Sequence, residues 1–172
     1  MKVFCTPRCG QNGSAAVYAL LENTFRAEYG ECLPEIKKTS NGKPFFPERP
    51  ELYFSLSHAK THVACALSDF PVGVDIESPR VISDRAIRYF CSDLELSLFY
   101  PLDLWVLKES YVKLIGGTLP QIKNLRFSRA NSDIITPEKN VISRLYSVDG
   151  CSAAVSTLGG APPASIELIY GS

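Results

Sequence analysis

Two short segments of the chain carry acidic and basic residues at spacings that could bind a divalent metal and a phosphate. The first has the sequence VGVDIE over residues 72–77. Residues two apart point to the same side of a strand, so Asp75 and Glu77 are expected to share one face. Two such carboxylates repel each other unless a cation relieves them, and Mg²⁺ binds through one or two carboxylates together with phosphate oxygens and water. An edge strand with a solvated polar face is the alternative interpretation.

The second segment has the sequence WVLKESYVK over residues 105–113 and predicts an amphipathic helix. Glu109 and Lys113 lie four apart on one face, and Lys108 adds a further cation. A Glu to Lys pair at this spacing is also an ordinary helix salt bridge, worth about 0.2–0.5 kcal/mol. The functional hypothesis therefore requires this helix to lie beside the 72–77 strand. A buried stripe is expected from four apolar residues at helical spacing: Leu104, Leu107, Tyr111 and Leu114.

The chain has two histidines, and only one of them has a context that suggests a function. Ser57 and His58 end a predicted strand, where the imidazole could donate to a phosphate. A lone histidine is more often structural, and His62 is interpreted in that way. Adjacent serine and histidine do not make the geometry of a hydrolase triad, and the chain contains no GxSxG motif.

The remaining pattern predicts helices and strands in an order that repeats. A helix over residues 14–29 and a loop over 34–50 precede three segments that read as strands. The short turns between these strands predict antiparallel pairing. A second helix set ends at Gly116, and the last third is read as mostly strands. The three strands are expected over residues 53–58, 62–68 and 72–77. A helix is expected over 83–90, another starts at 91–93, where Ser92 and Glu95 resemble a capping box, and the helix that contains Trp105 follows Pro101 and Asp103. The last third is expected to contain short strands over 125–129, 143–147, 153–157 and 165–170.

This repeat predicts an α+β fold of two pseudo-symmetric halves, each a helix packed on a small antiparallel sheet. Residues 151–156 would stand in the second half where residues 63–68 stand in the first. We expect a single domain over residues 1–172, with approximate halves 1–80 and 81–172, because this length suits one compact core.

Composition narrows the class of protein. Hydrophobic residues make up 45% and charged residues 21% of the 172 residues, as in globular domains, and no apolar run reaches the roughly 20 residues that span a bilayer. Eighteen basic and eighteen acidic residues balance, which argues against nonspecific nucleic-acid binding. The six cysteines form no zinc pattern. The N-terminus lacks the features of a signal peptide, so a cytoplasmic protein without disulfides is expected.

Four motifs in a fixed order resemble those of one enzyme family. NGKP (41–44), FSLSHA (54–59), VGVDIE (72–77) and WVLKESYVK (105–113) are each weak alone. Together they resemble the 4′-phosphopantetheinyl transferases, of the single-chain type that activates carrier proteins of fatty acid, polyketide and nonribosomal peptide synthesis. That family is built of two pseudo-symmetric α+β halves, in agreement with the repeat.

The resemblance implies transfer of 4′-phosphopantetheine from coenzyme A to a serine hydroxyl of an apo carrier protein, with release of adenosine 3′,5′-bisphosphate. It implies that Asp75, Glu77 and Glu109 bind Mg²⁺, or Mn²⁺ in its place, and that the metal neutralises charge on the pyrophosphate. Glu109 is then the candidate base for the serine, and Lys113 the group that meets the leaving phosphate oxygen. Asp75, Glu109 and Lys113 are accordingly the expected catalytic residues.

The resemblance also implies contacts with coenzyme A. The expected contact residues are Lys43, Pro44, Ser57, His58, Lys108 and Lys113. His58 would lie near the 3′-phosphate, for which Arg8, Lys37 and Lys38 are further basic candidates. The expected partners are an acyl or peptidyl carrier protein and coenzyme A, with no nucleic acid and no membrane, and a monomer is expected.

Two alternatives from other classes stay open. A module that binds coenzyme A or a carrier without turnover would keep the fold but should lack an acid or a lysine, and all of Asp75, Glu77, Glu109 and Lys113 are present. A magnesium-dependent phosphohydrolase would release phosphate from coenzyme A without an acceptor protein.

Overall fold

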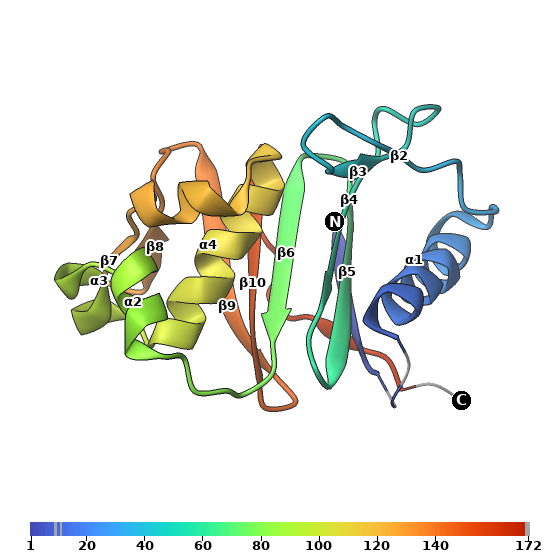
Figure 1. Cartoon of the computed structure of the whole chain (residues 1–172). Coiled ribbons are helices and arrows are strands. Elements are labelled where there is room, and N and C mark those ends of the chain that lie inside the picture. The colour runs from blue at the N-terminus through green and yellow to red at the C-terminus, as the bar shows by residue number, and fades with distance from the viewer. Residues whose placement is uncertain (9, 11, 171–172) are drawn as a thin grey trace.

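The computed structural model describes residues 1–8, 10 and 12–170, and its elements repeat one unit of strand, helix and hairpin. Figure 1 shows the two units side by side, with α1 and α4 on opposite sides of the strands. This arrangement confirms the expected α+β fold. The first unit comprises β1 (Lys2–Pro7), α1 (Gly13–Tyr29), β4 (Tyr53–His58) and β5 (His62–Ser68), and the second β6 (Val72–Glu77), α4 (Pro101–Ile115), β9 (Val141–Val148) and β10 (Cys151–Leu158).

The two main sheets have the same internal order. One runs β11-β1-β5-β4, where β11 is Glu167–Leu168, and the other runs β6-β10-β9. In each sheet the first strand of the unit pairs antiparallel with the last strand of its hairpin: β1 with β5, and β6 with β10. The strands β5 and β10 are therefore equivalent, as expected from residues 63–68 and 151–156.

The hydrogen bonds between strands place the boundary between the two halves at an earlier residue than the sequence predicted. Strand β6 pairs with β10, in a register that sets Asp75 opposite Ala154, and it forms no ladder with β5. The second sheet therefore begins at Val72, whereas the sequence placed the division near residue 80. Strand β11 returns to the first sheet and pairs in parallel with β1.

Several shorter elements lie within the two units, between their main helices and strands. Signals in the sequence set the ends of three helices. Ser92 and Glu95 form a capping box at the start of the helix Asp93–Leu98, and α1 and α4 end at Gly30 and Gly116, whose φ angles of 69° and 64° suit glycine. None of the described helices is both long enough and apolar enough to cross a bilayer. The short elements are β2 (Lys37–Lys38), β3 (Pro44–Phe45), α2 (Asp84–Phe90), α3 (Asp93–Leu98), the 3₁₀ helix η1 (Leu119–Asn124), β7 (Ser128–Ala130) and β8 (Asp133–Ile135).

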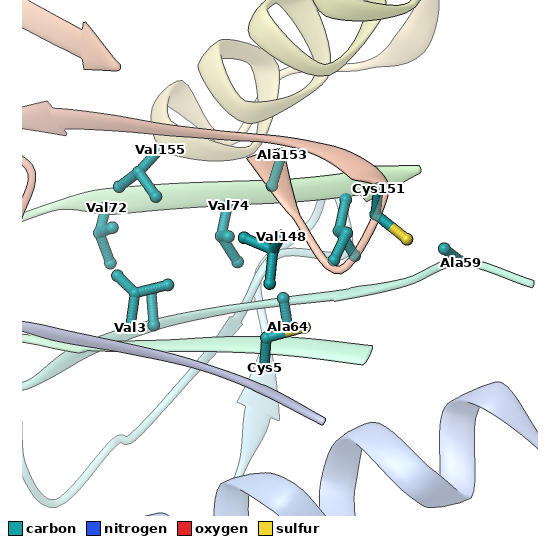
Figure 2. Close-up of a cluster of buried hydrophobic side chains, with 12 residues drawn as sticks. Val3, Cys5, Ala59, Ala64, Val72, Val74, Val148, Cys151, Ala153 and Val155 are labelled. Carbon is teal, nitrogen blue, oxygen red and sulfur yellow. The ribbon is translucent and has the colours of Figure 1, made fainter. Parts of the chain in front are cut away.

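The central core fills the space between the two sheets. Figure 2 shows Val72 and Val74 of β6 facing Val3 of β1, with Ala64 and Val148 completing the contact. Because alternate residues of β6 point into this core, the residues between them face the other way, toward α4. The strand therefore holds Gly73, Asp75 and Glu77 on the side where the candidate site was expected. Separate apolar clusters pack α1 and α4 against their own sheets.

Of the cysteines, Cys5, Cys65 and Cys151 are buried free thiols, Cys91 is half-buried and Cys32 is exposed. Cys9 lies outside the described residues. The expectation of structural or free thiols therefore stands for the five that the structure describes.

Candidate functional site

A buried carboxylate on β6 forms the centre of the site. Asp75 Oδ1 accepts hydrogen bonds from Ser57 Oγ and from Lys113 Nζ, both at 2.7 Å. Its other oxygen, Oδ2, is buried and has no hydrogen-bond partner among the residues that the structure describes. Burying a carboxylate oxygen without a donor costs free energy of folding, and such an oxygen in a native structure often has a functional reason. Because Ser57 and Lys113 hold the other oxygen, Asp75 is fixed in position with Oδ2 available to a ligand.

Serines of β4 join the two halves at this point. The outer N–H groups of β6 have no neighbouring strand to bond, and hydroxyls of β4 accept from them: Val74 N donates to Ser55 Oγ at 3.0 Å, and Ile76 N to Ser57 Oγ at 3.3 Å. Ser57 also accepts from Lys113 Nζ at 3.0 Å. One side chain therefore links β4, β6 and α4, and a single hydroxyl orients both charges of the Asp75 pair.

Gly73 lets α4 lie directly on β6. A Cβ atom at this position would come within 2.0 Å of the Ser110 carbonyl oxygen and 2.5 Å of the Leu114 nitrogen. Only glycine permits this approach of helix to strand. The close contact brings the polar face of α4, with Glu109 and Lys113, over Asp75.

Glu109 lies in this negatively charged environment. The pKa of its carboxyl is raised to about 7, chiefly by burial and then by Asp75 and Glu77, against the opposing effect of Lys113. The carboxyl groups of these three residues therefore influence one another, although they come from two elements. A carboxyl that titrates near neutral pH is suited to accept a proton in catalysis.

Glu77 is held at the edge of the site by a cation and an indole. Arg80 Nη2 donates to its carboxylate at 3.1 Å, and Trp105 Nε1 donates at 3.1 Å. The Arg80 guanidinium also lies 5.8 Å from the centre of the Trp105 ring. Glu77 thus contacts α4 through Trp105, and its oxygens already have donors.

The carboxylates do not form a ready-made metal cage. Within residues 1–8, 10 and 12–170, no three His, Cys, Asp or Glu side chains are grouped so that they could hold a metal ion. Mg²⁺ typically takes only one or two carboxylates and completes its shell with substrate phosphates and water. The unpartnered Oδ2 of Asp75 and the neighbouring Glu109 carboxyl fit a metal of that kind, shared with a phosphate ligand.

A cavity of about 260 Å³ opens beside Glu109 and Lys113. Its opposite wall is the 41–44 segment, in which Lys43 Nζ donates to the Leu114 carbonyl at 2.6 Å and Asn41 Nδ2 to the Gly116 carbonyl at 3.0 Å. Burial lowers the pKa of Lys43 to about 8. The NGKP segment therefore binds the C-terminal end of α4 and lines the same cavity as the charged residues of that helix. Pro44 also lines this cavity.

His58 is the last residue of β4 and lies next to the start of α1. A Cβ at Gly13 would come within 2.9 Å of the His58 ring and 3.1 Å of Arg8 Nη1, so the two basic side chains are close together there. The Arg8 guanidinium donates a hydrogen bond to the Ala59 carbonyl at 3.1 Å. Of the three basic candidates for the 3′-phosphate, the structure thus brings Arg8 to His58. Lys37 and Lys38 lie on the exposed strand β2.

Lys108 points away from the site. Its ammonium is completely buried and lies 2.9 Å from the Glu95 carboxylate, and it also donates to the carbonyls of Phe90 and Leu125. It stands four residues after Leu104 and three before Tyr111, which places it on the buried side of α4. The structure therefore does not bring Lys108 to the cavity expected to bind coenzyme A, and the side chain instead ties α4 to α3.

Sequence reasoning missed four residues that shape the site: Gly73, Ser55, Arg80 and Asn41. The glycine inside an apolar strand was a usable signal, because glycine there often marks a close backbone approach. Arg80 follows Glu77 by three residues, but only the fold shows that it also covers Trp105. His62 proves structural, with its ring bonded to Thr61 and to Asp149.

Comparisons with known proteins point to one family. The family model described as the 4′-phosphopantetheinyl transferase superfamily matches residues 71–155, which include Asp75, Glu77, Glu109 and Lys113. The chain is 35% identical over 88 residues to the 4′-phosphopantetheinyl transferase Sfp of Bacillus subtilis (strain 168), covering 45% of this chain and 39% of the relative. It is 36% identical over 122 residues to the 4′-phosphopantetheinyl transferase AcpT of Escherichia coli (strain K12), covering 60% of this chain and 57% of the relative.

A third relative, the 4′-phosphopantetheinyl transferase gsp of Aneurinibacillus migulanus, is 35% identical over 92 residues, covering 46% of this chain and 37% of the relative. The alignments thus span from about two fifths to just over half of the length of these relatives. The matched region contains β6 and α4, the two elements that carry the acidic residues of the site. Over residues 71–155 the chain is thus similar to the 4′-phosphopantetheinyl transferase superfamily.

Proposed function

We propose that the protein transfers 4′-phosphopantetheine from coenzyme A to a serine hydroxyl of an apo carrier protein and releases adenosine 3′,5′-bisphosphate. The observation that carries this proposal is the buried contact of Asp75 with Lys113 and Ser57, one Asp75 oxygen being left free, next to a cavity shared with Glu109. Acid and base groups lie together there, in a chain that resembles the 4′-phosphopantetheinyl transferases over residues 71–155.

Binding of Mg²⁺ is part of the proposal. Asp75 and Glu109 would supply the first carboxylates, and Glu77 would join them if its bonds to Arg80 and Trp105 rearrange. The metal, when bound, would supply positive charge to the pyrophosphate oxygens. Mn²⁺ would serve in its place because it accepts the same oxygen ligands.

Glu109 is the proposed base. The serine oxygen attacks the β-phosphorus of coenzyme A, a bond forms to the serine, and the phosphoanhydride bond to the nucleotide breaks. The hydroxyl proton must leave as the oxygen attacks, and a carboxyl with a pKa of about 7 is poised to take it.

Lys113 is proposed to act on the leaving group. Its ammonium is part-buried and already bonded to Asp75 and Ser57, so its position is fixed before substrate binds. A preorganised cation there would stabilise charge that develops on the departing phosphate oxygen. Ser57 would keep both Lys113 and Asp75 in position.

Coenzyme A is proposed to lie along the seam between the halves. Lys43 and Pro44 would contact it from the wall of the cavity, while His58, with Arg8 beside it, would meet the 3′-phosphate. Lys108 forms a buried ion pair with Glu95, so we do not include it among these contacts.

Intact-mass spectrometry tests the proposal directly. With Mg²⁺ and coenzyme A, at least one apo carrier in a panel of acyl and peptidyl carriers should gain the mass of phosphopantetheine. No gain on any carrier would contradict the transferase. Cleavage of coenzyme A without an acceptor would instead favour the phosphohydrolase, and binding of coenzyme A without turnover the non-catalytic module.

A variant pair tests the role of Glu109. Glu109→Gln keeps the shape but removes a metal ligand and the base, and should lower transfer by about 10³-fold or more. The matched control is Glu22→Gln, which changes an exposed glutamate on α1 that pairs with Arg26. Near-normal turnover by Glu109→Gln, with a folded protein by circular dichroism, would show that the assigned role is wrong.

A further inference from the structure

A second polar contact joins the two halves at the end of β6. Ser78 follows this strand directly, and the residue is only 6% exposed. Its Oγ accepts a hydrogen bond from Thr61 N at 3.0 Å and lies 2.8 Å from Thr61 Oγ1. Thr61 belongs to the turn between β4 and β5, so this contact runs from the second half to the first.

The hairpin of the second half supports the same turn. Thr61 Oγ1 lies 3.5 Å from Cys151 Sγ and 2.9 Å from Nδ1 of the buried His62 ring. The other nitrogen of that ring, Nε2, lies 3.1 Å from Asp149 Oδ2. Figure 2 shows Cys151 at the same end of the sheets as Ala59, the first residue of the turn. The turn therefore rests on the hairpin of β9 and β10 as well as on the end of β6.

This turn also holds Arg8 in place. Arg8 N donates to the Thr61 carbonyl at 2.7 Å, and the Arg8 guanidinium donates to the Ala59 carbonyl at 3.1 Å. A bond of 2.7 Å from Ala59 N to the His62 carbonyl closes the turn. His58 comes directly before these residues, so the turn sets the positions of both basic side chains, His58 and Arg8.

The end of β6 connects this turn to the acidic site. The ladder with β10 fixes β6 and sets Glu77 opposite Ser152. Ser78 is the next residue, so the hydroxyl that binds the turn is one residue from a proposed metal ligand. Coenzyme A carries its pyrophosphate and its 3′-phosphate on one ribose, so the groups that meet them must be held at a matching distance.

We propose that Ser78 and Thr61 are positioning residues that set the distance between the acidic site and the pair His58 and Arg8. They thereby decide how strongly the protein prefers coenzyme A to 3′-dephospho-coenzyme A. The inference rests on the proposed function, which brings the 3′-phosphate to His58 and Arg8. Neither positioning residue touches the ligand. Their hydroxyls keep the turn rigid, so less freedom is lost when the basic side chains bind the phosphate.

Isothermal titration calorimetry with the intact protein and Mg²⁺ tests this proposal without an acceptor. The wild type should bind coenzyme A at least about tenfold more tightly than 3′-dephospho-coenzyme A, because hydrogen bonds from charged groups to a phosphate are strong. Ser78→Ala should lower this preference by about fivefold or more. The loss should come from weaker binding of coenzyme A, while the Kd for 3′-dephospho-coenzyme A changes by less than about twofold.

The matched control is Ser68→Ala, at the other end of β5. Ser68 is also buried, and its hydroxyl likewise accepts a hydrogen bond from a backbone N–H, that of Phe70 at 3.1 Å. This variant should keep the preference of the wild type. It therefore separates the loss of any buried serine hydroxyl from the loss of the one that holds the turn.

Thr61 provides a second pair of variants. Thr61→Val keeps the shape but removes the hydroxyl, and it should lower the preference as Ser78→Ala does. Thr61→Ser keeps the hydroxyl and should restore the preference. In the Arg8→Ala/His58→Ala background, Ser78→Ala should change the preference by less than about twofold, because Ser78 acts through those two side chains.

Each result either supports or overturns the inference, once thermal unfolding shows that the variants are folded. An unchanged preference in both Ser78→Ala and Thr61→Val, or equal weakening of both ligands, would overturn it and leave the proposed function intact. Equal binding of the two ligands by the wild type would also overturn it, and transfer to a carrier would then still support the proposed function. No binding of coenzyme A, together with no modification of any carrier, would overturn the proposed function and this inference with it.

Discussion

The two faces of helix α4 hold two lysine–carboxylate pairs that differ in how completely they are satisfied. On one face, Lys108 Nζ lies 2.9 Å from Glu95 Oε1, and the two side chains are 0% and 1% exposed. On the other face, Lys113 Nζ lies 2.7 Å from Asp75 Oδ1, with the lysine side chain 30% exposed. Both pairs join α4 to a neighbouring element of the same half.

The hydrogen bonds around each pair show the difference. Glu95 accepts from Phe127 N through Oε1, and from the Ser92 N and Oγ through Oε2, so both oxygens are used. Asp75 leaves Oδ2 buried and unpartnered. A satisfied buried pair stabilises a single packing, whereas a pair with an open oxygen retains the capacity to bind a ligand. The first pair is therefore structural, and the second belongs to the site.

The largest effect is expected from breaking the satisfied pair. Lys108→Met should lower the free energy of unfolding by about 3–5 kcal/mol, because it leaves the Glu95 charge buried without its partner. Lys113→Met should cost less than about 2 kcal/mol, since the side chain is part-exposed, but should strongly reduce transfer. Urea unfolding and carrier modification by the two variants provide the measurements.

A double-mutant cycle makes that comparison sharper. Lys108→Met/Glu95→Leu should cost less than the sum of its two single variants, by more than about 1 kcal/mol, if the two side chains interact as the structure indicates. Additive costs would contradict the structural role of the pair. Equal stability losses in Lys108→Met and Lys113→Met would remove the distinction between the two faces.

Ligand-linked stability tests the open oxygen of the other pair. At a Mg²⁺ concentration about 100 times its dissociation constant, the wild type should gain about 2.7 kcal/mol in free energy of unfolding. Asp75→Asn should lose most of that gain, because the amide no longer offers a charged oxygen. Thermal unfolding in Mg²⁺ and in EDTA gives the difference, and an identical gain in Asp75→Asn would show that the metal binds elsewhere.

The comparison also shows how far the sequence could predict this site. The ends of α4 followed from Pro101 and Gly116, and the shared face of Asp75 and Glu77 followed from the alternation of the strand. Lys108 was expected to contact coenzyme A, because it adjoins Glu109 in the motif, whereas the structure pairs it with Glu95. Its period along the helix already set it with Leu104 and Tyr111, but its partner Glu95 comes from another helix, and such long-range contacts are not encoded in local patterns.

Sheet pairing was the other part that local patterns could not supply. Strand β1 was not predicted, and β6 was placed in the first half although it pairs with β10, about eighty positions further along the chain. Strand partners are chosen by packing between distant segments, so neither a short apolar run nor its turns identify them. The short motifs, such as VGVDIE, remained useful because each depends on one element at a time.

A smaller effect is expected at Gly73, on the side of β6 that faces the open pair. Gly73→Ala would place a Cβ against the Ser110 carbonyl and should cost about 1–3 kcal/mol by overpacking. The helix would move away from Asp75, so transfer should fall more than stability does. Gly150→Ala is the matched comparison for a glycine with no atom near its Cβ, though its positive φ adds some strain there. Full transfer by Gly73→Ala would show that the close contact of α4 and β6 is not needed.

The smallest effect concerns the proton on Glu109 in the protein without metal. The pKa of this carboxyl is raised from 4.5 to about 7, chiefly by burial and then by Asp75. The folded protein therefore binds the proton more tightly than the unfolded chain, and stability falls as pH rises from about 4.5 to about 7 and stays lower above that range. Glu109→Gln removes this loss, so in EDTA at pH 8 the variant should be more stable than the wild type by about 1 kcal/mol, a value reduced for the solvent that reaches this part-exposed group. Below about pH 4.5 the two should agree. Thermal unfolding across this range gives the measurement, and parallel curves for the two proteins would mean that neither burial nor the neighbouring carboxylates raise the pKa of Glu109.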